Sequence, residues 1–122
     1  MGIGTSTSFD LEAFRRGYEE WDIDALLVLY ADEVELIQLD RDNPPSAPRV
    51  RHGKDMFRGM FEHCAGAGVK ATVENAVAGE HRAAATVTCE FPGGRKVVAN
   101  GIFELEAGRI VRERQVLSGD PK

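Results

Sequence analysis

Apolar side chains recur every three or four residues in the first part of the chain, which is the spacing of one face of a helix. The first such stripe consists of Leu11, Phe14, Tyr18 and Trp21. Ser8 or Asp10 is placed to cap this helix. A shorter apolar run over residues 26–30 predicts a second helix, and residues 56–64 predict a third helix that begins after Gly53. We expect the first two helices to form a hairpin.

The remaining segments are rich in residues that favour strands. Residues 34–40 predict a strand that ends at a proline-rich loop. Four further strands are predicted at 69–77, 83–91, 95–105 and 109–117, with short glycine-containing turns between them. Helices followed by a run of antiparallel strands predict an α+β fold in which three helices cover one face of a curved antiparallel sheet.

The last predicted strand carries polar side chains on both faces. Side chains alternate along a strand, so Val111, Glu113, Gln115 and Leu117 share one face. The other face holds Ile110, Arg112, Arg114 and Val116. Burying two guanidinium groups without paired carboxylates is more costly than burying one carboxyl and one amide. We therefore expect the Glu113 face to point inward.

Length and charge limit the kind of protein. A chain of 122 residues with 43% hydrophobic residues makes one globular domain. We expect a flexible N-terminus at 1–8, a single domain at 9–119 and a tail at 120–122. Fifteen basic and twenty acidic residues give a net charge of −5, which argues against nucleic acid and anionic membrane as partners. No signal peptide is recognisable at the N-terminus, so we expect a cytoplasmic protein.

Cofactor and metal motifs are lacking in the sequence. Cys64 and Cys89 are far apart and lack the neighbours of a zinc site, so we expect both to be small buried hydrophobes. Gly93 and Gly94 form a turn rather than a nucleotide-binding loop. We expect no metal and no cofactor.

Several short segments together resemble one known family. They are WDIDAL at 21–26, LYADEV at 29–34, RHGK at 51–54, GRKVVA at 94–99 and AGRIV at 107–111. Their order and spacing resemble the nuclear transport factor 2-like superfamily, in its SnoaL-like polyketide cyclase and ketosteroid isomerase branch, over roughly Phe9 to Gly119. The resemblance implies a cone of curved sheet, an α+β barrel closed by helices around a ligand cavity. The same fold carries several activities, so it implies no single reaction.

The proton-transfer residues of ketosteroid isomerase are absent at the matching positions. That enzyme uses an aspartate base, with a tyrosine and a protonated aspartic acid as hydrogen-bond donors to the substrate oxygen. Gln38 stands at the position of the base and Phe14 at that of the tyrosine. The second aspartic acid falls at Gly101 or Phe103, and a further cavity tyrosine falls at Phe61. Steroid isomerisation by the usual residues is therefore not expected.

The resemblance places Gln38, Asp40, Glu113 and Gln115 in the cavity as its polar members. Burial would raise the pKa of Glu113 toward neutrality, which makes Glu113 the first candidate for a catalytic acid or base. The alternative is that Glu113 faces solvent or pairs with an arginine. Asp40 is the second catalytic candidate, and it is alternatively a solvated strand end. If Asp40 and Glu113 both face the cavity, they would form a carboxylate pair, and their mutual repulsion would raise the pKa of one of them further.

The candidate ligand-binding residues share a predicted place at the cavity wall or rim. They are Gln38, Gln115, Tyr18, Trp21, Phe14, Phe57, Phe61, Cys89, Phe103, Leu117 and His52. Tyr18 and Trp21 are alternatively plain core, and His52 is alternatively a rim residue beside the loop.

Two functions are consistent with these residues. In the first, a mainly apolar, cyclic or polyketide-like molecule binds in the cavity, and Glu113 moves a proton while Gln38, Gln115 and Tyr18 hold a ligand oxygen. In the second, the chain is a non-catalytic binding or dimeric assembly module. In this superfamily the outer sheet face commonly makes a homodimer, so Arg112 and Arg114 would pair with Glu104 or with acids of another subunit.

Overall fold

The structure is a computed structural model that describes residues 8–122. Its helices and strands, in chain order, are α1 (Leu11–Glu20), α2 (Ile23–Val28), β1 (Tyr30–Leu39), β2 (Arg49–His52), α3 (Lys54–Gly66), β3 (Lys70–Ala78), β4 (Arg82–Glu90), β5 (Lys96–Glu106) and β6 (Arg109–Gly119). The predicted flexible N-terminus lies outside the described residues except for Ser8.

Local capping explains the helical hairpin of α1 and α2. The Asp10 carboxylate accepts a hydrogen bond from the Ala13 N–H at 2.9 Å, which starts α1. Trp21 ends α1 in the left-handed conformation, with φ 52°, and Asp22 then caps α2. The two helices pack closely at Gly17, where an added Cβ would lie 2.7 Å from Leu26 Cγ. The hairpin predicted from the sequence is present.

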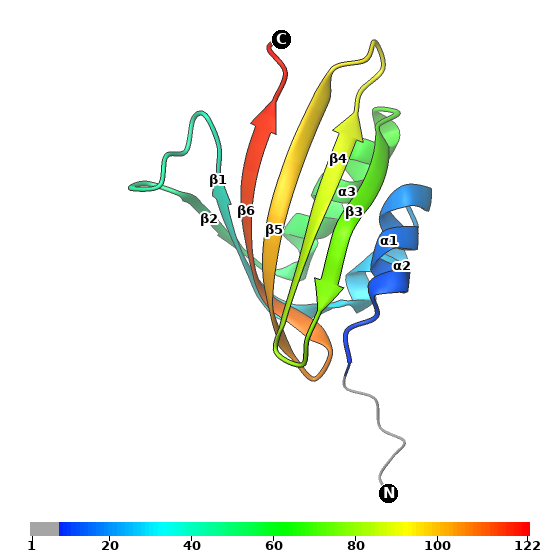
Figure 1. The fold of residues 1–122 in the computed structure, drawn as a ribbon, viewed down its shortest axis with the longest axis vertical. Coiled ribbons are helices and arrows are strands. Elements are labelled where there is room, and N and C mark those ends of the chain that lie inside the picture. The colour runs from blue at the N-terminus through cyan, green and yellow to red at the C-terminus, as the bar shows by residue number, and fades with distance from the viewer. Residues whose placement is uncertain (1–7) are drawn as a thin grey trace, which may run out of the picture.

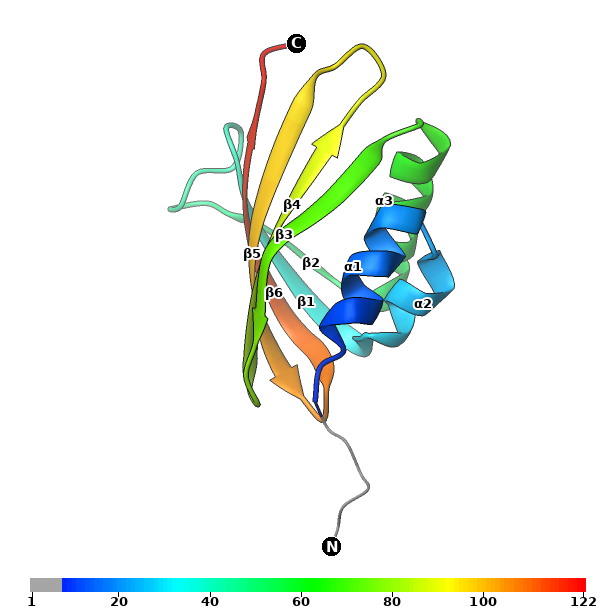
Figure 2. The ribbon, with the colours of Figure 1, turned by 45° about the vertical axis from the view of Figure 1, so that its right-hand side comes forward.

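Six strands form one curved sheet in the order β2-β1-β6-β5-β4-β3. All neighbouring pairs are antiparallel except β1 with β6, which is parallel. The three helices lie on one side of the sheet, which curves around them (Figure 1, Figure 2). The sheet stays open, with β2 and β3 at its edges, and the architecture is the expected α+β cone.

Two elements differ from the sequence prediction. Tyr30 begins β1 instead of ending the second helix, because its backbone pairs with Ile110 of the last strand. The strand β2 was not predicted, since its four residues follow the proline-rich loop and show no apolar run. Both differences arise from strand pairing, which depends on residues outside the local segment and cannot be predicted from the local pattern.

A bulge in β6 changes which side chains face inward. Glu104 pairs with Arg112 and Leu105 pairs with Ile110, so Val111 is an extra residue on β6. Ile110 is therefore fully buried, although strict alternation put it on the outer face with Arg112. Beyond the bulge, alternation is regular and Glu113 faces inward, as the cost of burying arginine predicted.

Aromatic side chains fill most of the space between the helices and the sheet. The rings of Tyr30 and Phe57 lie 4.3 Å apart between centroids, and those of Phe14 and Tyr18 lie 5.0 Å apart. Phe103 joins this cluster from β5, with its ring 5.3 Å from that of Phe14. The part of the concave face that these rings leave uncovered contains a cavity.

Candidate functional site

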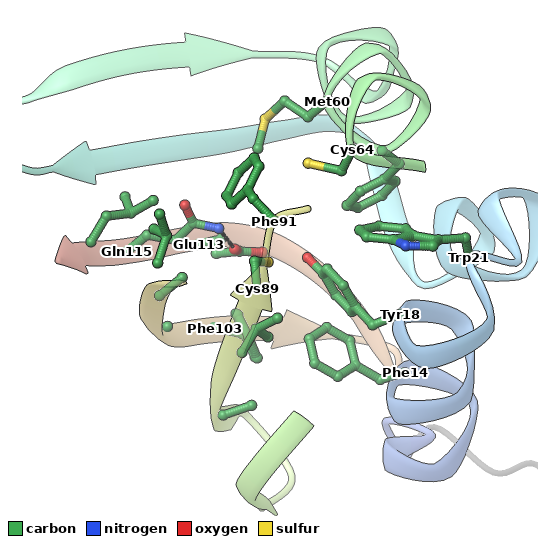
Figure 3. Close-up of a pocket in the computed structure, with 17 residues that line it drawn as sticks. Phe14, Tyr18, Trp21, Met60, Cys64, Cys89, Phe91, Phe103, Glu113 and Gln115 are labelled. Atoms are coloured by element: carbon green, nitrogen blue, oxygen red, sulfur yellow. Dashed lines mark hydrogen bonds between the residues drawn. The ribbon is translucent and has the colours of Figure 1, made fainter. Parts of the chain in front are cut away.

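The cavity has a volume of about 170 Å³ and lies between α1, α3 and the concave face of β4, β5 and β6 (Figure 3). The residues that line it are Phe14, Tyr18, Trp21, Met60, Phe61, Cys64, Ala85, Val87, Cys89, Phe91, Val97, Ala99, Gly101, Phe103, Glu113, Gln115 and Leu117. Most of these side chains are apolar. Glu113 and Gln115 supply the carboxyl and the amide of the wall.

The exposure of the lining residues shows where the cavity opens. Phe14, Tyr18 and Phe103 at one end are buried. Met60 on α3 and Phe91 after β4 are half-buried, as are the lining residues of the adjoining ends of β5 and β6. The closed end is therefore at α1, and the mouth is between α3 and the β4–β5 hairpin.

Glu113 is the buried carboxyl of this wall, with only 2% of its surface exposed. Its Oε1 accepts a hydrogen bond from the Tyr30 hydroxyl at 3.1 Å, and its Oε2 accepts one from the Gln115 amide. Burial raises the pKa of Glu113 to about 7, against the two hydrogen bonds, which favour the carboxylate and lower the pKa. Both the acid and the carboxylate forms are thus populated near neutral pH.

The Gln115 amide belongs to a longer chain of hydrogen bonds. Gln38 Nε2 donates to Gln115 Oε1 at 3.0 Å, and Arg51 Nη2 donates to Gln38 Oε1 at 2.7 Å. The register explains this arrangement, since Gln38 of β1 lies directly opposite Gln115 of β6. Arg51 reaches Gln38 from β2, on the other side of β1.

Two tyrosines complete the polar surroundings of Glu113. Tyr18 from α1 and Tyr30 from β1 are both buried, and each phenol influences the pKa of the other. Burial, followed by the charge of Glu113, raises the pKa of both phenols well above 10, so both remain neutral. The Tyr18 hydroxyl points toward Glu113 (Figure 3).

The sequence profile of the SnoaL-like domain matches residues 11–113. The chain belongs to the SnoaL-like family. Among proteins with curated descriptions, none matches it.

Solved structures share the fold of this SnoaL-like domain at low sequence identity. A proposed ketosteroid isomerase from Kribbella flavida DSM 17836 is 14% identical, with a TM-score of 0.70 over 92% of this chain and 77% of its own. An NTF2-like protein of unknown function from Mesorhizobium loti is 20% identical, with a TM-score of 0.71 over 89% of this chain and 88% of its own. The epoxide hydrolase/cyclase-like enzyme SalBIII, which is described with a role in pyran ring formation in polyether salinomycin, is 23% identical. Its TM-score is 0.64 over 88% of this chain and 86% of its own.

The structure brings nine of the residues predicted for the site together at the cavity wall. They are Glu113, Gln115, Tyr18, Trp21, Phe14, Phe61, Cys89, Phe103 and Leu117. Trp21 contributes its ring only, because its indole N–H donates to the Val69 carbonyl at 2.7 Å. Gln38 and Phe57 lie behind this wall, where Gln38 bonds to Gln115 and Phe57 packs on Tyr30.

Asp40 and His52 lie away from the cavity. The Asp40 carboxylate accepts hydrogen bonds from the side chain and backbone of Asn43 and from the Asp42 N–H, and it closes the turn after β1. These bonds, led by that of the Asn43 side chain, lower the pKa of Asp40. His52 is exposed, and its Nε2 lies 3.1 Å from Glu35 Oε2. The carboxylate pair of Asp40 with Glu113 is therefore not formed.

Several residues of the site were not among the candidates from the sequence, Met60, Cys64, Tyr30 and Arg51 among them. Met60 and Cys64 line the mouth, and their spacing of four on the apolar side of the third helix was a usable signal. Tyr30 was assigned to a helix, and Arg51 lies in the strand that was not predicted. No local pattern indicated a place in the site for either of these two.

Among residues 8–122, no group of three or more His, Cys, Asp or Glu side chains is placed to hold a metal ion. In the same part of the chain, no helix has both the length and the apolar character needed to cross a membrane.

Proposed function

We propose that this SnoaL-like domain binds a small, mainly apolar cyclic molecule and that Glu113 transfers a proton between two atoms of it, in an isomerisation or a cyclisation. The observation that carries this proposal is the Glu113 carboxyl, buried at the wall of an apolar cavity and with a pKa of about 7. A group with such a pKa both accepts and releases a proton near neutral pH. No ion pair of the described residues includes Glu113.

The volume and lining of the cavity limit the ligand. An apolar protein cavity of about 150 Å³ holds one benzene molecule, so about 170 Å³ accommodates a single six-membered ring with small substituents. A four-ring steroid is too large for it. In the part of the chain that the structure describes, the lining contains no Lys, Arg or His. A neutral ligand is therefore favoured over an anionic one.

The geometry supplies both parts of a proton transfer. Glu113 as carboxylate takes a proton from a carbon beside a carbonyl group, and negative charge then develops on the carbonyl oxygen. The Tyr18 hydroxyl lines the same cavity and stabilises that charge by donating a hydrogen bond. Glu113 returns the proton to another carbon of the ligand, which restores the carboxylate. Gln38 takes no direct part, since it lies behind the wall.

A six-membered β,γ-unsaturated ketone tests this proposal. Cyclohex-3-en-1-one fits the cavity, and moving one proton from C2 to C4 converts it to conjugated cyclohex-2-en-1-one. We expect the wild-type protein to accelerate deuterium exchange at C2 and the absorbance rise of conjugation, and Glu113→Gln to abolish both while the ketone still binds. The exposed Glu90→Gln variant is the matched control. Equal exchange by the wild type and Glu113→Gln would exclude Glu113 as the base.

A non-catalytic binding module is the second candidate. Both oxygens of Glu113 already accept hydrogen bonds from protein side chains, which favours a structural role for this carboxyl. The same experiment separates the two functions. Saturable binding of cyclohex-3-en-1-one without exchange in the wild-type protein would identify a binding module.

The homodimer through the outer sheet face, in a cytoplasmic protein, stays a prediction. Ile102 and Val116 are 54% and 51% exposed on that face, which supports an apolar contact. Arg112 beside them is already paired within the chain, with Glu35 at 2.7 Å and Glu104 at 3.1 Å. Light scattering of the wild type and Ile102→Glu measures the mass, and a wild-type monomer would refute the prediction.

A further inference from the structure

Four side chains from three neighbouring strands form one continuous hydrogen-bonded chain that ends on the cavity carboxyl. Arg51 of β2 donates to Gln38 of β1, Gln38 donates to Gln115 of β6, and Gln115 donates to Glu113. Arg51, Gln38 and Gln115 have no direct role in the proposed proton transfer. The chain links Glu113 to a cationic group on the edge strand.

The direction of every bond in the chain follows from Arg51. A guanidinium group has donors only, so the Gln38 atom that faces it must be the carbonyl oxygen. The Gln38 amide nitrogen then faces Gln115 and meets its carbonyl oxygen, which leaves the Gln115 nitrogen to face Glu113. Without Arg51, both amides could reverse and present a carbonyl oxygen to the carboxyl.

The fixed direction distinguishes the two oxygens of Glu113. Oε2 accepts the N–H of Gln115, so a proton on Oε2 would face another hydrogen and have no acceptor there. Oε1 faces the Tyr30 hydroxyl, which can donate or accept. When Oε1 is protonated it can donate to the Tyr30 hydroxyl, which then acts as the acceptor.

We propose that Arg51 is a positioning residue that acts through Gln38 and Gln115 to keep Glu113 Oε2 a hydrogen-bond acceptor, so that Oε1 is the atom that takes up and releases the proton. The catalytic consequence rests on the proposed function of Glu113. The assignment of the two oxygens does not, because it concerns the ligand-free protein.

The surroundings of Arg51 agree with this role. Arg51 takes part in none of the ion pairs between described residues. Its Nε is buried and has no partner, and its Nη2 contacts Met60 Sδ at 3.4 Å besides bonding to Gln38. The side-chain oxygen that Arg51 holds is therefore that of Gln38.

The other titratable groups near Glu113 are neutral around pH 7. Tyr18 of α1 and Tyr30 of β1 have pKa values raised well above 10 by burial. Burial also raises the pKa of the Cys64 thiol on α3 and raises that of Cys89 on β4 to about 11. If substitution of Arg51 changes the titration midpoint of Glu113, a charge change on one of these tyrosines or cysteines is therefore not the cause.

The test follows the titration of Glu113 in the ligand-free protein by infrared spectroscopy of the protonated carboxyl stretch, assigned with Glu113→Gln. Arg51→Met keeps the length and the contact with Met60 but removes the donors. We expect it to raise the midpoint by about one pH unit, because reversed amides accept from the protonated acid. Arg51→Lys, which also has donors only, should keep the wild-type midpoint.

Two further variants distinguish the chain from the charge alone. Arg49→Met removes the arginine directly opposite Gln38 on β2, whereas the bond to the Gln38 side-chain oxygen comes from Arg51, so it should move the midpoint by less than about 0.3 pH units. In a Gln38→Met background the chain is already broken, so Arg51→Met should add no further shift.

Three results would overturn the inference: an unchanged midpoint in Arg51→Met, an equal shift in Arg49→Met, or a shift from Arg51→Met that persists in the Gln38→Met background. These outcomes are independent of activity. If Glu113→Gln leaves the exchange of cyclohex-3-en-1-one unchanged while the titration behaves as expected, the proposed function fails and the assignment of Oε1 stands.

Discussion

Replacing Glu113 by Gln should stabilise the protein at alkaline pH and leave it less affected at acid pH. Glutamine keeps the size and one carbonyl acceptor of the carboxyl but carries no charge. In the folded chain the pKa of Glu113 is raised to about 7 by burial, from an ordinary value of 4.5. Between these two values the folded protein binds a proton that the unfolded chain has released, so folding becomes less favourable as pH rises through this window.

The magnitude follows from the size of that difference. One pKa unit corresponds to about 1.4 kcal/mol, so a displacement from 4.5 to about 7 lowers the free energy of unfolding by about 3 kcal/mol once the pH is above 7. The group is fully buried, so solvent screening does not reduce this figure much. For a domain of this length, 3 kcal/mol corresponds to roughly 10 °C in Tm.

The assay is chemical denaturation of the wild type and Glu113→Gln at several pH values from 4.5 to 8. The difference in free energy of unfolding, variant minus wild type, should rise by about 3 kcal/mol across this range. Glu90→Gln, at an exposed glutamate of β4, measures the effect of removing one negative charge from the surface. Parallel curves for the wild type and Glu113→Gln, or a difference that falls with rising pH, would refute the burial argument.

Three further substitutions test separate parts of the structure. Gly101→Ala places a Cβ 2.8 Å from Phe103 Cε1, so the Phe103 ring must move into the cavity. We expect the free energy of unfolding to fall by about 1–3 kcal/mol and cyclohex-3-en-1-one to bind more weakly. Unchanged stability would contradict this packing. Tyr18→Phe should lower the exchange rate roughly 100- to 1000-fold with little change in ketone binding, because it removes the hydrogen-bond donor to the charged oxygen. An unchanged rate would exclude this role of the hydroxyl. Arg112→Met breaks the ion pairs of Arg112 with Glu35 and Glu104 on the outer face, and it should leave stability nearly unchanged without moving the Glu113 titration. A shifted midpoint would show that the outer face acts on the cavity.

Burial of Glu113 has opposite effects on stability and on the proposed chemistry. The same apolar surroundings that destabilise the carboxylate raise its pKa to the range in which it exchanges protons. A chain selected for stability alone would carry an uncharged residue at this position. The hydrogen bonds from Tyr30 and Gln115 partly offset the cost and also orient the carboxyl.

The helices, most strands and the inward face of the last strand were determined by local pattern. Helix caps and apolar stripes are formed by residues within a few positions of one another, so the Asp10 cap and the first two helices could be predicted. The inward position of Glu113 followed from the cost of burying the arginines on the opposite face.

Only the tertiary structure decided the network around Glu113. The positions of Tyr30 and Gln38 depend on the parallel pairing of β1 with β6, which joins segments far apart in the chain. The position of Arg51 depends on the edge strand β2, which pairs with β1 across the proline-rich loop. The bulge at Val111, which buries Ile110, depends on the same pairing. Asp40 looked equivalent to Gln38 by alternation, but the turn after β1 binds its carboxylate. Alternation specifies the face of a side chain, whereas register and turns specify which groups it meets, and hydrogen bonds depend on the latter.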